Sequence, residues 1–161
     1  MSISEKPLIY NKDIKESGNV FLAPFIGCLE SNIQKFCKRE IDCLNSAIKM
    51  QHKLKDDLIK FVHIDNGGKS GIKHKINKKQ EGTEEGFPDV MIIVSNLDKS
   101  KRLTMFLEFK RIGTPSQIHI TDKQYYYNKW LSDAGFYARI INNPLFFRMK
   151  IIAKIQEFIN Q

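Results

Sequence analysis

The sequence predicts an α/β fold in which a mixed four-stranded sheet is flanked by helices. Apolar runs at residues 88–95 and 103–110 are joined by a short polar link, which is typical of an antiparallel hairpin. A helical pattern over residues 121–134 then leads to another apolar run at 136–141. Because a helical crossover normally joins parallel strands, this last strand makes the sheet mixed.

A long helix and a short strand are expected before the hairpin. Apolar residues recur at three- and four-residue steps over residues 29–62, which predicts helix. The stretch is long for one helix, so two helices with a break near Asn45 and Ser46 are an alternative. Residues 61–64 form a short apolar run, interpreted as the first strand, and the turn sequence at 65–68 ends it.

A lysine-rich segment follows that turn. Ile72 and Ile76 have helical spacing in it, and Gly82 is expected to stop a short helix. The lysines of this segment are Lys69, Lys73, Lys75, Lys78 and Lys79. Two interpretations remain open, namely contact with phosphate groups and a solvated helix face.

Helices are also expected on both sides of the last strand. The helix opened by Thr121 should run to about Ala134, where Gly135 stops it. Asn143 and Pro144 should start a final helix, because proline suits the first helical turn. The predicted apolar stripe of this helix is Phe147, Ile151, Ile155 and either Phe158 or Ile159.

Composition indicates one basic domain. With 161 residues and 42% hydrophobic residues, the chain can bury one core, so we assign residues 29–161 to the domain and residues 1–28 to an N-terminal extension. The apolar run 20–29 is far shorter than the roughly 20 apolar residues of a membrane span, and no signal peptide is visible. A net charge of +8 favours an anionic partner, most often nucleic acid.

Cysteine usage favours a reducing compartment. Cys28, Cys37 and Cys43 are odd in number and lack the paired spacing of a zinc site. Reduced thiols are therefore expected, which predicts a cytoplasmic location.

Three charged residues interrupt the apolar hairpin. Asp89 lies near the start of one predicted strand, and Glu108 and Lys110 lie at the end of the other, on one face by strand alternation. Two carboxylates held close together repel unless a cation lies between them, and oxygen ligands suit Mg²⁺ or Mn²⁺. We therefore expect metal-assisted phosphodiester hydrolysis, with Lys110 stabilising negative charge. The alternative is a surface ion pair at a strand end.

These residues match a known signature. Pro88-Asp89 followed by Glu108-Phe109-Lys110 resembles the PD…ExK signature of the PD-(D/E)xK nuclease superfamily, which implies a restriction-endonuclease-like core of order α-β-β-β-α-β. The wider set, which covers about residues 30–142, resembles the VRR-NUC (virus-type replication-repair nuclease) family. That set is Asn66-Gly67-Gly68-Lys69, Lys79-x-x-Gly82, Gly86-Phe87-Pro88-Asp89, Glu108-Phe109-Lys110, Gln124 and Leu131-x-x-Ala134-Gly135-Phe136.

The resemblance implies further site residues. It adds an acidic residue on the first helix, for which Glu30 fits an ExxxQ pattern and Glu40 is a rival. It also adds Gln124, although Thr121 and Gln124 alone would form a capping box. The implied catalytic set is Asp89, Glu108, Lys110, Gln124 and Glu30. The implied metal ligands are Asp89, Glu108, Glu30 and the backbone carbonyl of Phe109. The expected DNA-binding residues are Asn66, Lys69 and Lys79 of the motif set, together with Lys73 of the lysine-rich segment and Arg111 just after the signature.

The activity implied by the resemblance is cutting of branched DNA, such as Holliday junctions or flaps, in repair, recombination or replication. Such enzymes act as symmetric dimers, and the first helix with residues 20–29 could supply the interface. The site of action would be the nucleoid or a viral replication site. Alternatives are an inactive, basic nucleic-acid-binding module and a nuclease with another DNA target.

Aromatic residues crowd the helix that carries Gln124. Packing is the default role for Tyr125, Tyr126, Tyr127 and Trp130. An exposed member of this group could instead stack on an unpaired base.

Overall fold

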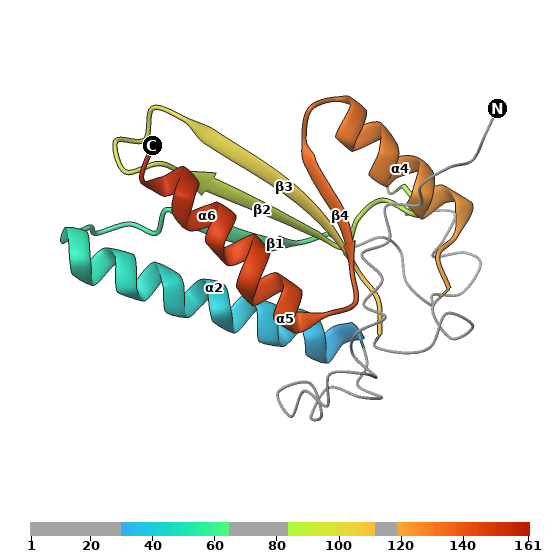
Figure 1. Cartoon of the computed structure of the whole chain (residues 1–161), viewed down its shortest axis with the longest axis horizontal. Helices are drawn as coiled ribbons and strands as arrows, with labels where there is room; N and C mark the ends of the chain where they lie inside the picture. The colour runs from blue at the N-terminus through green and yellow to red at the C-terminus, as the bar shows by residue number, and fades with distance from the viewer. Residues whose placement is uncertain (1–29, 65–83, 112–118) are drawn as a thin grey trace.

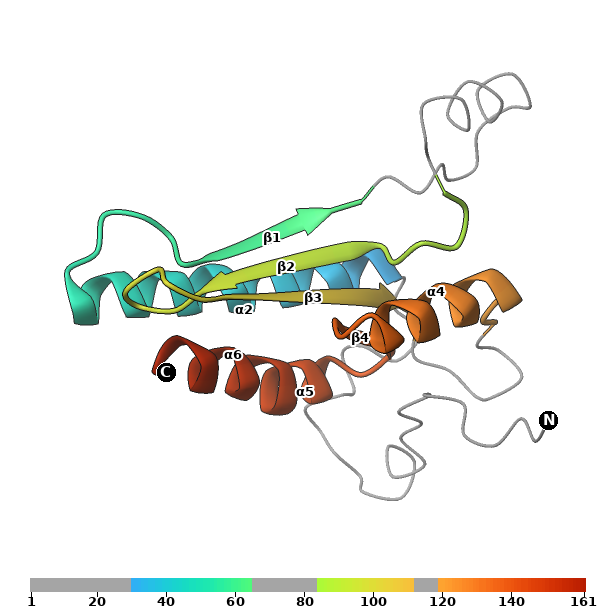
Figure 2. The same cartoon turned by 90° about the horizontal axis from the view of Figure 1, so that it is seen from above.

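The computed structural model describes residues 30–64, 84–111 and 119–161, which form one sheet with helices on both faces (Figures 1 and 2). The N-terminal extension and the lysine-rich segment lie outside the described residues. The predicted DNA contacts Asn66, Lys69, Lys73 and Lys79 therefore lie outside them as well. Within the described residues, no helix is long and apolar enough to cross a membrane.

The sheet has the spatial order β1-β2-β3-β4. Its strands are β1 (Ile59–His63), β2 (Val90–Ser95), β3 (Arg102–Phe109) and β4 (Tyr137–Ile141). The first three strands pair antiparallel, and β4 pairs parallel with β3. The predicted α/β class, the mixed sheet and the α-β-β-β-α-β order are confirmed.

The first helix, α2, is a single helix from Glu30 to His52, so the alternative of a break near Asn45 is wrong. Asn45 faces the sheet, where its side chain donates to the carbonyl of Ile59 at 2.9 Å and accepts from the amide of Ile59 at 3.1 Å. The two bonds satisfy backbone groups of the edge strand β1, which explains a buried polar residue inside the helix. The helix also ends earlier than its apolar pattern suggested, since Lys53 adopts a positive φ of 53°.

The helix α4 (Asp122–Asp133) begins and ends as predicted. Thr121 caps it through a capping box with Gln124, and Gly135 follows it at a φ of +88°. Because local sequence decides both ends, periodicity and cap residues were sufficient to place this helix.

The C-terminal helix contains a π-helical turn that was not predicted. It consists of α5 (Pro144–Phe146), the π turn η2 (Phe147–Ile151) and α6 (Ile152–Ile159), with Asn143 capping its start. The predicted stripe is buried at Phe147, Ile151, Ile155 and Ile159. A strict four-residue repeat drifts by about 40° per step on an α-helix, and one wider turn offsets part of that drift.

The helices divide the sheet into an inner and an outer face. The inner face packs against α2 and the C-terminal helix, which lie along the same side of the sheet (Figures 1 and 2), and it holds the larger apolar core. The outer face packs against α4 around a small cluster of Phe106, Leu131 and Ala138. Strand β3 serves both faces, since Leu107 and Phe109 point inward and Glu108 points outward.

Candidate active site

Asp89 and Glu108 meet at the end of the hairpin. Val90 pairs with Leu107 in the β2–β3 register, so Asp89, one residue earlier, lies opposite Glu108. The Oδ2 atom of Asp89 accepts a hydrogen bond of 3.0 Å from the amide of Phe109. This bond ties the Asp89 carboxylate to β3 beside Glu108, as the hairpin argument predicted.

Glu108 is buried, with only 3% of its surface exposed. Its Oε1 atom accepts hydrogen bonds from Lys110 Nζ at 2.9 Å and from Gln124 Nε2. Its Oε2 atom is also buried and has no hydrogen-bond partner among the described residues. A carboxylate oxygen left in this way is unfavourable, so the site favours an added proton or cation there.

The electrostatics of the site agree with that geometry. The pKa of Glu108 is raised to about 7, first by burial and then by the negative charges of Asp89 and Glu30, while Lys110 opposes the shift. A buried carboxylate whose pKa is raised towards neutral pH by other carboxylates is a common feature of functional sites.

Gln124 serves two partners at once. Its Oε1 atom accepts from the amide of Thr121 at 3.1 Å, which completes the capping box of α4. Its Nε2 atom donates to Glu108. The two roles that the sequence set against each other therefore coexist, because an amide carries an acceptor and a donor on one side chain.

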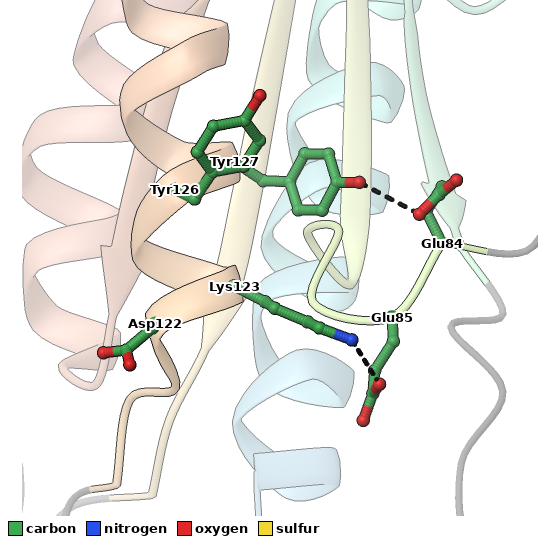
Figure 3. Close-up of a pocket in the computed structure, with 6 residues that line it drawn as sticks. All are labelled: Glu84, Glu85, Asp122, Lys123, Tyr126 and Tyr127. Atoms are coloured by element: carbon green, nitrogen blue, oxygen red, sulfur yellow. Dashed lines mark hydrogen bonds and ion pairs between the residues drawn. The ribbon is translucent and has the colours of Figure 1, made fainter.

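Gly86 explains how the chain approaches α4 just before Asp89. Its φ is +88°, and a Cβ atom there would lie 2.6 Å from the Cβ atom of Lys123. Beside this close approach, Lys123 forms an ion pair with Glu85 at 2.7 Å, and the hydroxyl of Tyr127 donates to Glu84 at 3.0 Å (Figure 3).

An aromatic contact reinforces the same seam. The ring of Phe87 packs edge to face against Phe106 at 5.6 Å and against Tyr127 at 5.5 Å. Segment 84–89 is thereby held against the helix that carries Gln124. The sequence analysis included Gly86 and Phe87 in the motif but missed Glu84 and Glu85. Their position directly before the motif was the signal that could have identified them.

The structure distinguishes Glu30 from Glu40. Glu30 is the first residue of α2 and is close enough to raise the pKa of Glu108. Glu40 instead forms a two-point ion pair with Arg148 of the π turn, at 2.6 and 2.7 Å. Glu30 is therefore the first-helix acid that the fold brings to the site.

The residues fit an oxygen-ligated divalent cation. Within the three described ranges, no three His, Cys, Asp or Glu side chains converge into a complete metal cage. Mg²⁺, however, is usually bound through one or two carboxylates and keeps several waters. The unpartnered Oε2 atom of Glu108 and the facing Asp89 match that requirement.

The remaining predicted residues were placed only in part. Phe109 ends β3 and Arg111 lies exposed just beyond Lys110, so the ligand role of one and the DNA contact of the other stay predictions. Of the cysteines, Cys37 is buried and Cys43 exposed, both as free thiols.

Comparisons of the chain with protein-family models, curated proteins and solved structures found no match.

Proposed function

We propose that the protein is a divalent-metal-dependent endonuclease that hydrolyses DNA phosphodiester bonds, in the manner of the VRR-NUC family it resembles. The observation that carries this proposal is Glu108, a buried carboxylate with one oxygen unpartnered among the described residues. It faces Asp89, and Lys110 donates to its other oxygen. A surface ion pair would not explain why both members of the pair are buried.

Each residue has a chemical role in this proposal. Asp89 and Glu108 would hold Mg²⁺ or Mn²⁺, with Glu30 and the carbonyl of Phe109 as further ligands. The bound ion would supply Lewis acidity at a phosphoryl oxygen and a lower pKa for water. Lys110 would stabilise negative charge that develops on the phosphate. Gln124 positions Glu108 through its hydrogen bond.

The proposed substrate is branched DNA, namely Holliday junctions or flaps, cut in repair, recombination or replication. The net charge of +8 supports an anionic partner of this kind. A homodimer is proposed with it, because two cuts placed symmetrically need two sites.

The test is cleavage of linear, flap and four-way DNA with Mg²⁺ or Mn²⁺. Asp89→Asn keeps an oxygen for the amide of Phe109, and Lys110→Met removes only the ammonium. We expect each to lower the rate by at least about 100-fold. Matched controls are Asp133→Asn and Lys60→Met, which alter exposed ion pairs and should leave the rate unchanged.

The outcomes separate the alternatives. Cutting that survives Asp89→Asn would overturn the site assignment. Binding of DNA without cutting by the wild type would leave an inactive binding module. A preference for linear DNA would indicate another target, and a mass measurement in solution decides the dimer.

A further inference from the structure

A pocket of about 300 Å³ lies beside the candidate site, between segment 84–86 and the first two turns of α4 (Figure 3). It is lined by Glu84, Glu85, Asp122, Lys123, Tyr126 and Tyr127. Both walls continue into the site, because one segment leads to Asp89 and the other helix carries Gln124. A group held in this pocket would therefore touch the two segments that carry Asp89 and Gln124.

One wall offers an exposed aromatic ring. Tyr126 is 60% exposed, and its ring makes an edge-to-face contact with Tyr127 at 5.3 Å. Trp130, one turn further along α4, is 50% exposed. Exposed rings of this kind are suited to stacking on a flat ring of a ligand.

The opposite wall offers hydrogen-bond acceptors. The lining contains three carboxylates and one ammonium, so the net charge of the pocket is negative and repels phosphate, although the whole chain is basic. The hydroxyl of Tyr127 donates to Oε2 of Glu84, and a carboxylate can accept up to about four hydrogen bonds. Burial, the hydrogen bond to Glu84 and the charge of Glu84 raise the pKa of Tyr127, which keeps this hydroxyl protonated as a donor.

We propose that this pocket receives an unpaired guanine of the nucleic-acid substrate, stacked on Tyr126 and hydrogen-bonded to Glu84. Guanine presents two adjacent donors, N1–H and the 2-amino group, to one carboxylate, whereas thymine presents one N–H between two carbonyls. Extruded bases are commonly recognised by stacking and by hydrogen bonds to their Watson–Crick edge, where these guanine donors lie. The inference rests on the proposed function only in taking nucleic acid as the ligand.

The test measures binding in EDTA, so that no cleavage is required. Three labelled thymidine heptamers carry guanine, hypoxanthine or thymine at the centre, and anisotropy gives their affinities. We expect guanine to bind about ten-fold more tightly than thymine, with hypoxanthine between them because it lacks the 2-amino group. Trp130 is the only tryptophan of the chain, so quenching of its fluorescence locates the bound base on α4.

Variants separate base recognition from general charge. Glu84→Gln should abolish the preference for guanine, whereas the exposed Glu157→Gln removes the same charge elsewhere and should preserve it. Tyr126→Ala should weaken binding of the guanine heptamer about ten-fold, and Tyr126→Phe should not.

Equal affinity for the three heptamers, or a preference that survives Glu84→Gln, overturns the base site even if the protein cuts DNA. A preference for guanine in a protein that does not cut supports the base site while the proposed endonuclease activity fails. Failure to bind any heptamer overturns the base site, since the ligand would then be of another class.

Discussion

The inner and outer faces of the same sheet differ in what their side chains do. On the inner face, α2 and the C-terminal helix cover β3 with apolar side chains, which form the larger, buried core. On the outer face, α4 covers the same strand with Gln124, which meets Glu108, and the apolar cluster is small. The comparison teaches that stability is concentrated on one face, which leaves the other able to hold buried charges that would otherwise be too costly.

The strongest test of this division is truncation on the inner face. Ile155 of α6 is fully buried there, so Ile155→Ala should lower the free energy of unfolding by about 2–5 kcal/mol. Cleavage per folded molecule should not change. Urea unfolding and initial rates measure the two quantities, and Met149→Ala, at an exposed position in the π turn that precedes α6, should change stability by less than about 0.5 kcal/mol. A cleavage rate that fell with stability would show that the faces are coupled.

The next effect is the pH dependence of Glu108. Its pKa of about 7 in the folded protein lies above the ordinary value of 4.5, so the folded state binds the proton more tightly. This contribution to stability is present below about pH 4.5 and is lost as pH rises through 7, in total about 3 kcal/mol. Glu108→Gln cannot titrate, so without metal the wild type should lose stability relative to it between pH 5 and 8.

Parallel stability curves for the two proteins, measured by denaturant unfolding at each pH, would contradict the pKa of Glu108. Mn²⁺ at pH 8 should raise the stability of the wild type and not that of Glu108→Gln, because the ion replaces the missing proton. Asp133→Gln is a suitable control, since this exposed carboxylate lies on α4 away from Glu108.

A smaller effect distinguishes the two acids of α2. Glu30→Gln should lower cleavage about ten-fold, as expected for a ligand at the edge of the metal site, and should leave stability nearly unchanged. Glu40→Gln should leave cleavage intact and cost about 1 kcal/mol, because it breaks the pair with Arg148. Rates and thermal unfolding of both variants provide the measurement, and the reverse pattern would make Glu40 the site acid.

The smallest effect separates the two bonds of Gln124. Gln124→Glu keeps the oxygen that accepts from the amide of Thr121, so the stability of α4 should not change. It also places a further carboxylate beside Glu108, which should raise the pKa of Glu108 above 7. Gln124→Met loses both bonds and should cost about 1 kcal/mol. Thr121→Ala, which disrupts the cap alone, is the control. If stability, measured by unfolding at each pH, depended on pH in the same way in all three variants, Gln124 would act only as a cap.

Much of the fold was predictable because its signals are local. Strand alternation placed Glu108 and Lys110 on one face, and the short link made the hairpin that brings Asp89 opposite Glu108. Capping by Thr121 and Gly135 gave the ends of α4. The end of α2 was less predictable, because Leu54 and Leu58 continue the apolar period into a segment that packs on the core without being helical.

Sequence alone thus determined the class of the fold, the hairpin and the placing of Asp89 opposite Glu108, since these follow from periodicity within each element and from the short link between two strands. Only the tertiary structure decided that Glu40 pairs with Arg148, that Gly86 must lie against Lys123, and that one amide of Gln124 serves both Thr121 and Glu108. Apart from the local bond between Thr121 and Gln124, these contacts join segments far apart in the chain. Their geometry follows from how helices pack on a sheet, and periodicity within one segment carries no information about it.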